Sequence, residues 1–443
     1  MKKNPGKLHV PHRKNTAGLA PVKLPAPKEV LIPLDQHIGA LANPVVKAGD
    51  TVKIGQLIAE AGGPVSSNIY ASVSGTVTKI EECLRSNGRV VPAIRIESDG
   101  LMEVYEDLTP PTVTDVDSLV EATRKAGLVG MGGAGFPTAV KFNALKSGNI
   151  HTVILNGAEC EPYITSDARA MVDEPEYIYK GIKLIQSVAP SLKFIIGIEN
   201  NKPDCIKAMS DVIKGDDSVS ILSLPSRYPQ GAEKVLIYNA LGLTVPENKL
   251  PGDLGVIVLN VTTAATLAKY AETGMPLVER CVTVDGSAVK EPKNVIAPIG
   301  TPISELIEFA GGLYEGPCKV IMGGPMTGRA ASSLSEPIGK TSNAIVILNE
   351  KDSVGKKTTA CLHCGKCIEA CPLSLTPSEF SRALKLESVD DRMALLDSQR
   401  INLCMECGSC SFNCPAARPI MENIRIAKNS FREYKAHQSS LKK

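Results

Sequence analysis

The sequence predicts a multidomain protein of mixed α/β class, in which small β modules flank a parallel α/β domain and a helical domain ends the chain. Three observations lead to this prediction. The chain has 443 residues, too many for one hydrophobic core. Apolar β runs alternate with helical stretches through its middle. Eight of the 13 cysteines fall into two runs near the C-terminus. We place the domains at 1–112, 113–270, 271–345 and 346–443.

The composition argues against several functional classes. A net charge of +2 does not fit a nucleic-acid-binding protein, which is usually strongly basic. The absence of Trp leaves few side chains on which single-stranded bases could stack. No apolar run reaches the roughly 18 residues of a membrane helix, and the basic N-terminus lacks the apolar part of a secretory signal. Cysteines grouped as metal ligands in such a chain indicate a reducing cytoplasm. We expect a soluble or peripheral protein.

Residues 30–80 predict a small β barrel-sandwich. Short β runs are separated by turn sequences at Ala48–Asp50 and at Ser74 and Gly75. The pattern resembles biotinyl and lipoyl domains, but the expected hairpin tip at Ser72–Ser74 lacks the lysine that would carry a swinging cofactor. We therefore interpret this module as a docking or scaffold domain, and we interpret its His37 as structural.

The next part of the chain alternates helices with strands. Asp115 or Asp117 can cap a helix over 118–126, and a Gly-rich loop over 127–137 then leads into a helix near Thr138. The later strands are predicted at Val153–Leu155, Phe194–Ile198, Val219–Leu222 and Val256–Leu259. Helices are predicted at Pro175–Val188 and Pro203–Lys214. This alternation predicts a Rossmann-like, mostly parallel sheet.

Residues 281–312 return to β structure around one helix. The helix is predicted at Pro302–Phe309 and closed by Gly311 and Gly312. We expect a small α+β unit of the β-grasp kind.

Two identical cysteine runs mark the last domain. They are Cys361, Cys364, Cys367 and Cys371, followed by Pro372, and Cys404, Cys407, Cys410 and Cys414, followed by Pro415. The spacing C-x2-C-x2-C-x3-C followed by Pro is typical of a pair of [4Fe–4S] clusters. Structural zinc is the alternative, although zinc sites more often use two pairs of ligands. The fourth cysteine of such a run binds the neighbouring cluster, so we expect Cys371 at the second cluster and Cys414 at the first.

The segment between the two runs is long enough for secondary structure of its own. Pro377–Leu396 predicts two helices, so we expect a helical ferredoxin-type domain. The tail over 418–436 predicts an amphipathic helix that packs on this domain, with a partner or membrane-surface contact as the alternative.

The Gly-rich loop is a candidate anion site. Backbone N–H groups and the dipole of the following helix favour a phosphate there. A bare tight turn is the alternative, because no strand runs directly into the loop as a G-x-G-x-x-G motif requires. Two strand ends strengthen the first interpretation. Polar loops follow the strands at Val153–Leu155 and Val256–Leu259, and ligands bind α/β sheets at the carboxyl ends of strands.

These segments carry a family resemblance. GLVGMGGAGFPTAVKF, NGAECEP, RYPQGAEK and NVTTAATLA resemble the FMN- and NADH-binding segments of the flavoprotein subunit of respiratory complex I. The order of the modules resembles the RnfC family of the Rnf complex, a membrane ferredoxin:NAD oxidoreductase. The cobalamin reductase of propanediol-using microcompartments is similar too, but that family places the flavin domain first, so the N-terminal sandwich favours Rnf.

The resemblance implies cofactor-binding residues in four segments. They are Gly130, Gly132, Gly133 and Lys141 around the FMN phosphate, Asn156 and Glu159 beside the isoalloxazine and ribityl chain, Tyr228, Gly231 and Glu233 on the nicotinamide side, and Asn260, Thr262 and Thr263 at the flavin tail. It implies catalytic roles for Glu159 and Glu233.

The sequence departs from the complex I pattern at three positions. Met131 replaces an arginine of the glycine loop, and Ala158 and Ala232 each replace an acid. The FMN assignment survives these changes more easily than the NADH contacts do. Cys160 falls within the flavin loop, where we interpret it as a small neutral neighbour, with redox participation as the alternative.

The resemblance also implies a mechanism and partners. Hydride transfer moves two electrons and a cluster accepts one, so a flavin is the natural adaptor between them. Electrons would move between NAD(H), FMN, two [4Fe–4S] clusters and other Rnf subunits, among them a ferredoxin-like iron–sulfur subunit and membrane subunits, with ferredoxin reached indirectly. The protein would sit peripherally on the cytoplasmic face of the membrane. The alternatives are a cobalamin reductase and an electron-transfer scaffold without a nucleotide site.

Overall fold

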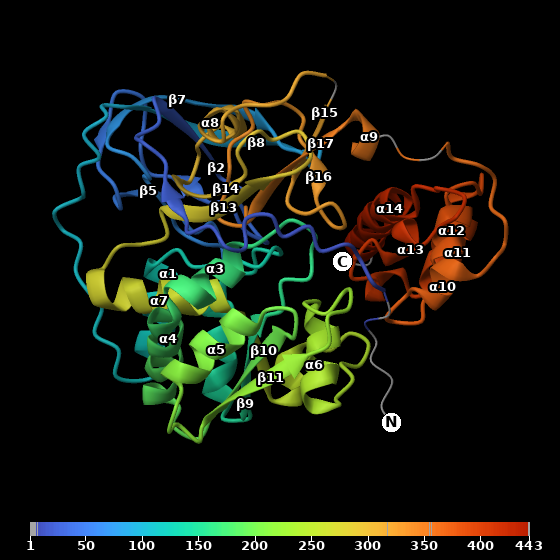
Figure 1. The fold of residues 1–443 in the computed structure, drawn as a ribbon, viewed down its shortest axis with the longest axis horizontal. Coiled ribbons are helices and arrows are strands. Elements are labelled where there is room, and N and C mark those ends of the chain that lie inside the picture. Colours follow the sequence, from blue (N-terminus) through green and yellow to red (C-terminus); the bar gives the residue numbers. More distant parts are fainter. Residues whose placement is uncertain (1–5, 7, 317, 354, 356, 442–443) are drawn as a thin grey trace.

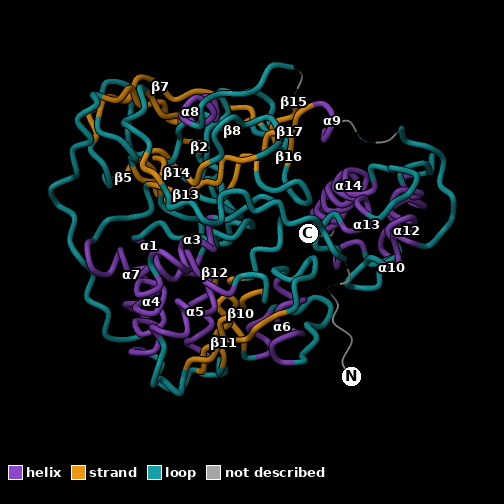
Figure 2. Tube along the Cα trace, in the orientation of Figure 1, coloured by secondary structure: helices purple, strands orange, loops and turns teal. Residues whose placement is uncertain are grey.

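A computed structural model describes residues 6, 8–316, 318–353, 355 and 357–441. It confirms the mixed α/β class. Figure 1 shows a β-rich part at the top, an α/β part below it and a helical domain at the right. Figure 2 shows that the strands gather in the first two parts, whereas the helices dominate the third. Within the described residues, no helix combines the length and apolar character that a membrane span requires.

The α/β part contains a four-stranded parallel sheet of order β11-β10-β9-β12. The strands are β9 (Thr152–Gly157), β10 (Lys193–Glu199), β11 (Val219–Leu224) and β12 (Val256–Asn260). The helices are α1 (Val116–Lys125), α2 (Thr138–Asn143), α3 (Ser166–Asp173), α4 (Pro175–Val188), α5 (Pro203–Val212), α6 (Glu233–Leu241) and α7 (Val261–Thr273). Short 3₁₀ turns cover Ala144–Ser147 and Pro251–Leu254. The predicted strands and helices of this part are confirmed.

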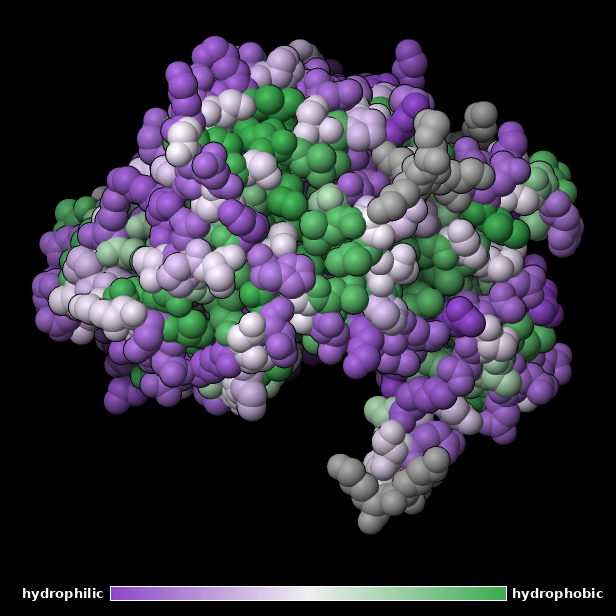
Figure 3. Space-filling model, turned by 90° about the horizontal axis from the view of Figure 1, so that it is seen from below, coloured by the Kyte–Doolittle hydropathy of each residue, from purple (hydrophilic) through white to green (hydrophobic). Residues whose placement is uncertain are grey.

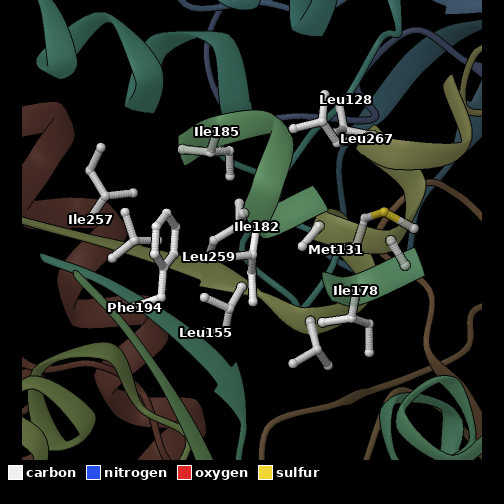
Figure 4. Packing of buried hydrophobic residues seen from close by; sticks show 14 of the residues in the cluster. Leu128, Met131, Leu155, Ile178, Ile182, Ile185, Phe194, Ile257, Leu259 and Leu267 are labelled. Carbon is white, nitrogen blue, oxygen red and sulfur yellow. The ribbon is translucent and has the colours of Figure 1, made fainter. Parts of the chain in front are cut away.

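Local chemistry explains where the first helix begins. The Asp115 carboxylate accepts a hydrogen bond of 2.8 Å from the Ser118 amide, which satisfies one of the free donors of the first turn of α1. The core lies between the sheet and helices α4 and α7. Figure 4 shows Leu155, Ile182 and Leu259 from β9, α4 and β12 pointing toward one another. Each such buried side chain contributes roughly 1.5–3 kcal/mol.

The N-terminal module contains two small antiparallel sheets. One has the order β2-β8-β7-β4 and the other β3-β5-β6. Their strands are β2 (Glu29–Pro33), β3 (Asn43–Pro44), β4 (Thr51–Val52), β5 (Leu57–Glu60), β6 (Ile69–Tyr70), β7 (Gly75–Leu84) and β8 (Val90–Ser98). Ser72 and Ser74 are buried, and the Ser72 hydroxyl donates to the Ile299 carbonyl. The segment that carries the cofactor in lipoyl domains therefore packs against the next β module.

That module contains a six-stranded mixed sheet of order β1-β14-β13-β17-β15-β16. Its elements are β1 (Val22–Lys23), β13 (Glu279–Asp285), β14 (Lys293–Pro298), α8 (Ile303–Phe309), β15 (Cys318–Met322), β16 (Arg329–Ala330) and β17 (Ala344–Asn349). Strand β1 comes from the N-terminus and pairs in parallel with β14. Residues 8–24, which we call the N-terminal strap, thus run away from the barrel-sandwich and end in the second sheet.

The last domain, the cluster domain over 357–441, is helical. A short α9 (Glu350–Ser353) leads into it, and its elements are α10 (Lys366–Glu369), α11 (Pro377–Ala383), α12 (Val389–Ser398), a 3₁₀ turn (Ile401–Leu403), α13 (Ser409–Phe412) and α14 (Ile420–Leu441). Residues Ile424, Ala427 and Phe431 of α14 are buried against α11 and α12. The predicted pair of helices and the packing of the tail helix on this domain are confirmed.

The surface of the molecule is mixed in character. Figure 3, which views the molecule from the bottom of Figure 1, shows hydrophobic residues gathered in the middle of that face and hydrophilic residues around its rim. Large exposed apolar side chains of the cluster domain include Leu362, Ile368 and Phe412.

Candidate functional site

Four segments converge at the carboxyl ends of β9 and β12. They are the glycine loop (127–137), the acidic loop (156–162), the Tyr228 loop (227–234) and the β12–α7 turn (260–263). The Thr263 hydroxyl accepts from the Met131 amide at 3.1 Å and thereby joins the glycine loop to α7. The Asn156 side chain donates to the Gly231 carbonyl at 2.9 Å and joins the acidic loop to the Tyr228 loop. The structure thus brings together the segments that the sequence predicts to form one site.

The glycine loop needs glycine at two of the predicted positions. Gly133 adopts a φ of +135°, in a region that other residues rarely enter. A Cβ atom at Gly132 would lie 3.1 Å from the side-chain nitrogen of Asn260. Gly132 and Gly133 are exposed, whereas Met131 between Gly130 and Gly132 is buried. The backbone of the loop can therefore approach a ligand closely on its outer side.

Lys141 lies in α2 and reaches toward the end of β12. Its ammonium donates to the Val258 carbonyl at 2.9 Å and lies 3.5 Å from the Glu233 carboxylate. Glu233 begins α6, where a carboxylate is favoured by the helix dipole. A predicted phosphate ligand and a predicted catalytic residue therefore form an ion pair.

Glu159 makes contacts that differ from the predicted catalytic role. Its carboxylate is buried and accepts from the amides of Asp167 at 2.8 Å and Ala168 at 3.4 Å. These are free donors in the first turn of α3, so Glu159 caps that helix from outside it. Burial raises the pKa of the Glu159 carboxyl above its usual range. The side chain holds α3 against the acidic loop.

Asp167 is a site residue that the sequence analysis missed. Its two carboxylate oxygens accept from the Asn260 amide at 2.7 Å and from the Thr262 hydroxyl at 2.6 Å. The Asn260 side-chain oxygen in turn accepts from the Thr263 amide at 3.2 Å and caps α7. Two predicted flavin-tail residues are thus oriented by one carboxylate. The helix that carries Asp167 was not predicted, and this left its acid without a context.

The N-terminal strap supplies a second missed residue. The Lys14 ammonium donates to the backbone carbonyls of Glu159 at 2.9 Å and Glu161 at 2.8 Å, and also to that of Ile164. Burial lowers the pKa of Lys14 from its usual value. A lysine far from the site in sequence therefore fixes the course of the acidic loop. No local pattern around Lys14 could have revealed this.

Cys160 lies between these groups. Burial raises the pKa of its thiol to about 12, and its sulfur accepts from the Gly231 amide at 3.4 Å. A thiol that stays protonated is a weak nucleophile. This environment supports the interpretation of Cys160 as a small neutral neighbour.

Tyr228 points to the cluster domain. It is 2% exposed, and its hydroxyl donates to the Cys407 carbonyl at 2.7 Å. Burial raises the pKa of this phenol well above its usual value. The structure thus places a residue predicted for the nicotinamide side in contact with the second cysteine run.

The eight cysteines line two cavities. Cys371, Cys404, Cys407 and Cys410 line the inner cavity, and Cys361, Cys364, Cys367 and Cys414 line the outer cavity. Each cavity combines three thiols of one run with the fourth thiol of the other, which is the crossed arrangement that the spacing predicts. Within the described chain, no group of His, Cys, Asp or Glu side chains is close enough to hold a single metal ion. A cubane of four irons holds its thiolates apart, so four-thiol cavities fit [4Fe–4S] clusters.

The two cavities differ in their surroundings. Cys371 and Cys410 of the inner cavity are buried, whereas Cys361 and Cys364 of the outer cavity are exposed. The inner run also touches the β module, because a Cβ atom on Gly408 would lie 2.3 Å from the Met326 carbonyl oxygen. The inner cavity therefore faces the rest of the protein, and the outer cavity faces solvent.

Comparisons with known proteins agree with this arrangement. Four family models match in chain order. They are the RnfC barrel sandwich hybrid domain over residues 2–101, the Nuo51 FMN-binding domain over 123–269, the SLBB domain over 281–330 and the 4Fe-4S dicluster domain over 357–418. The matches cover most of the chain.

Two bacterial proteins are similar along most of their length. The RnfC-type component of the proton-translocating ferredoxin:NAD(+) oxidoreductase complex of Clostridium ljungdahlii is 42% identical over 382 residues, which are 85% of this chain and 83% of the relative. Its counterpart in the Na(+)-translocating complex of Acetobacterium woodii is 40% identical over 384 residues, 85% of this chain and 87% of the relative. A crystal structure of NAD+-reducing [NiFe]-hydrogenase in the H2-reduced state shares the fold, with a TM-score of 0.51 at 18% identity, and the match covers 72% of this chain and 64% of that one.

Proposed function

The chain belongs to the RnfC family of ion-translocating ferredoxin:NAD(+) oxidoreductase complexes, and from this premise we propose that it moves electrons between NAD(H) and the other subunits of such a complex. The observation that carries the proposal is the contact between the two halves of the route. The Tyr228 loop of the nucleotide site touches the second cysteine run directly, through the hydrogen bond from Tyr228 to Cys407.

The site residues fit an FMN. When bound, FMN exchanges a hydride with NAD(H) and exchanges single electrons with iron–sulfur clusters. The exposed amides of the glycine loop and the Lys141 ammonium supply donors for its phosphate. Asp167 holds the side chains of Asn260 and Thr262 for the flavin tail. Glu159 and Lys14 act as positioning residues, since both bind backbone groups of the surrounding loops.

Glu233 remains the candidate for contact with the nicotinamide. Its carboxylate is 43% exposed and is balanced by Lys141 rather than buried in a helix cap. An exposed carboxylate at this place can accept hydrogen bonds from a nucleotide. Gly231 and Asn156 keep the Tyr228 loop close to the acidic loop.

The cluster domain provides an order for the two thiol sets. The inner cavity, with Cys407, lies against the nucleotide site, so its cluster would be the one that exchanges electrons with the flavin. The outer cavity, with Cys361, would face the partner. Apolar side chains around it include Leu362 at 63% exposure and Phe412 at 49%.

The charges around the outer cavity favour an acidic partner. Its lining includes Arg382, Lys385 and Arg418. Opposite charges speed the association of two proteins and orient them. A ferredoxin-like iron–sulfur subunit with an acidic surface fits this face, and membrane subunits would complete the complex at the cytoplasmic side of the membrane.

The division into 1–112, 113–270, 271–345 and 346–443 is also part of the proposal. It assigns a barrel-sandwich, a Rossmann-like flavin domain, a β-grasp domain and a dicluster ferredoxin domain. The matched family regions support it, since each lies within one of these four ranges.

An anaerobic titration tests the function. Iron and FMN are first counted in the reconstituted full chain, and NADH is then added while flavin absorbance and cluster EPR signals are followed. We expect flavin bleaching followed by signals of reduced clusters. Bound clusters without flavin, and no response to NADH, would leave an electron-transfer scaffold in place of the proposed redox enzyme.

A pair of lysine variants links that titration to the site. Lys141→Met should lower FMN retention during gel filtration, because it removes the charge near the phosphate. Lys146→Met is the matched control, since Lys146 lies shortly after α2, is 46% exposed and pairs with Asp117. Equal retention in both variants would contradict the role of Lys141.

A further inference from the structure

An arginine from the second β module reaches into the nucleotide site. Arg280 lies on β13, yet its Nη2 atom donates to the Met131 carbonyl of the glycine loop at 3.1 Å. Its Nε atom donates to the Ser342 carbonyl at 3.2 Å. The residue is 2% exposed, so its guanidinium lies inside the protein, directly behind the glycine loop.

The charge of Arg280 is incompletely matched. Its Nη1 atom is buried and has no hydrogen-bond partner among the described residues. Asp167 is the carboxylate whose field acts on it, but both Asp167 oxygens already accept from Asn260 and Thr262. Burying a cation is unfavourable unless an anion is close by. The region around the guanidinium thus has positive charge to spare.

The peptide bond after Met131 carries this charge to the outer side of the loop. A trans peptide places its carbonyl oxygen and the next N–H on opposite sides. Arg280 holds the Met131 oxygen from inside, so the Gly132 N–H points outward, where Gly132 is exposed. The Thr263 hydroxyl fixes the preceding amide of Met131 at 3.1 Å. The loop is therefore held with a donor aimed at solvent and a cation behind it.

We infer that Arg280 is a positioning residue of an anion site at Gly132, and that it fixes and polarises the loop for a phosphate monoester. This inference rests on the proposed function, in which the monoester is that of FMN. It also implies that the second β module contributes to flavin binding, although it lies outside the flavin domain. Arg280 compensates for Met131, which stands where complex I flavoproteins have an arginine.

Two flavins that differ only in the phosphate separate this role from a general structural one. The full chain is freed of flavin, and binding of FMN and of riboflavin is measured by flavin fluorescence. For Arg280→Met we expect FMN affinity to fall by about 10- to 100-fold, as for a lost hydrogen bond to a charged group. Riboflavin affinity should stay the same. Arg280→Gln, which keeps a donor but no charge, is the second variant, and it should behave likewise.

A neighbouring arginine provides the matched control. Arg85 joins the barrel-sandwich to the same β module, through Asp35 at 3.4 Å and the Pro337 carbonyl at 3.4 Å, away from the glycine loop. Arg85→Met should leave the ratio of FMN to riboflavin affinity unchanged.

Other results would overturn the inference. Equal losses for both flavins, or unchanged FMN affinity in both Arg280 variants, would show that Arg280 has no role toward the phosphate. If the unmodified chain bound neither flavin, the proposed function would fail, and inorganic phosphate would decide the anion site alone. A phosphate-induced rise in the unfolding temperature that Arg280→Met lacks would support it, and equal rises would reject it.

Discussion

The hydroxyl of Tyr228 donates a 2.7 Å hydrogen bond to the backbone carbonyl of Cys407, and this contact joins the nucleotide site to the inner cysteine cavity. Both partners are far apart in sequence, and Tyr228 is almost fully buried. The position of the inner cavity relative to the flavin domain thus depends in part on one phenol.

Removing that hydroxyl should slow electron exchange without emptying the flavin site. Tyr228→Phe leaves the Cys407 carbonyl without its donor, at a cost of roughly 1 kcal/mol. In anaerobic stopped-flow mixing with NADH, we expect normal flavin bleaching and slower cluster reduction. Tyr314→Phe is the control, because Tyr314 is 59% exposed. Equal cluster reduction rates in both variants would assign Tyr228 to packing alone.

The crossed cysteine sets predict which variants should resemble one another. Cys371→Ala should give the same iron loss and EPR spectrum as Cys404→Ala, because both line the inner cavity. Cys414→Ala should instead match Cys361→Ala at the outer cavity. A match between Cys371→Ala and Cys361→Ala would mean that each run binds its own cluster. The exposed Cys318 provides a control, since Cys318→Ala should keep all the iron.

Lys14→Met should destabilise the acidic loop. The substitution leaves the carbonyls of Glu159, Glu161 and Ile164 without their donor. We expect a loss of about 3 kcal/mol in the free energy of unfolding, because buried acceptors without partners are costly. Urea unfolding measures this loss. Lys23→Met, at a 67% exposed side chain of the strap, should change little, and similar midpoints for the two variants would argue against the role of Lys14.

Lys340 predicts a pH-dependent stability. Its ammonium donates to the Gly127 carbonyl at 2.7 Å and to Ser67 at 3.2 Å, where the barrel-sandwich meets the flavin domain. Burial lowers the pKa of Lys340 from 10.5 to about 7. Between these values the unfolded chain binds a proton that the folded chain does not, so stability should rise with pH, by up to about 1.4 kcal/mol per unit.

Lys340→Met should remove this rise. The difference in unfolding free energy between the unmodified chain and the variant should grow from pH 7 to pH 10 and stay flat below pH 7. The neighbouring His37, whose pKa burial lowers to about 4, stays neutral in this window. Lys319→Met, at an exposed position, should leave the slope unchanged. A constant difference between the unmodified chain and Lys340→Met would show that Lys340 keeps an ordinary pKa.

The sequence predicted those parts of the fold that local chemistry determines. The cap at Asp115, the four strands of the parallel sheet and the helices after Pro175 and Pro203 all carry signals within a few residues. The cysteine spacing likewise predicted how the thiols divide between the two cavities.

Long-range contacts explain what the sequence could not predict. Lys14 and Arg280 act at the site from segments more than a hundred residues away, and neither lies in a motif. Tyr228 and Glu159 lie in predicted binding segments, but their side chains bind the cluster domain and a helix end. A motif identifies a loop, whereas the direction of each side chain depends on what folds around that loop.

The N-terminal strap has a consequence for how the chain is assembled during synthesis. Its β1 pairs with β14, and the carbonyl of its Thr16 accepts from Asn294 at 3.1 Å, 278 residues further on. A ribosome makes the strap first, yet most of the chain must emerge before these partners exist. The oldest segment of the nascent protein is therefore fixed late, and until then the acidic loop lacks the lysine that holds it. Insertion of cofactors can be expected to follow this late closure rather than precede it.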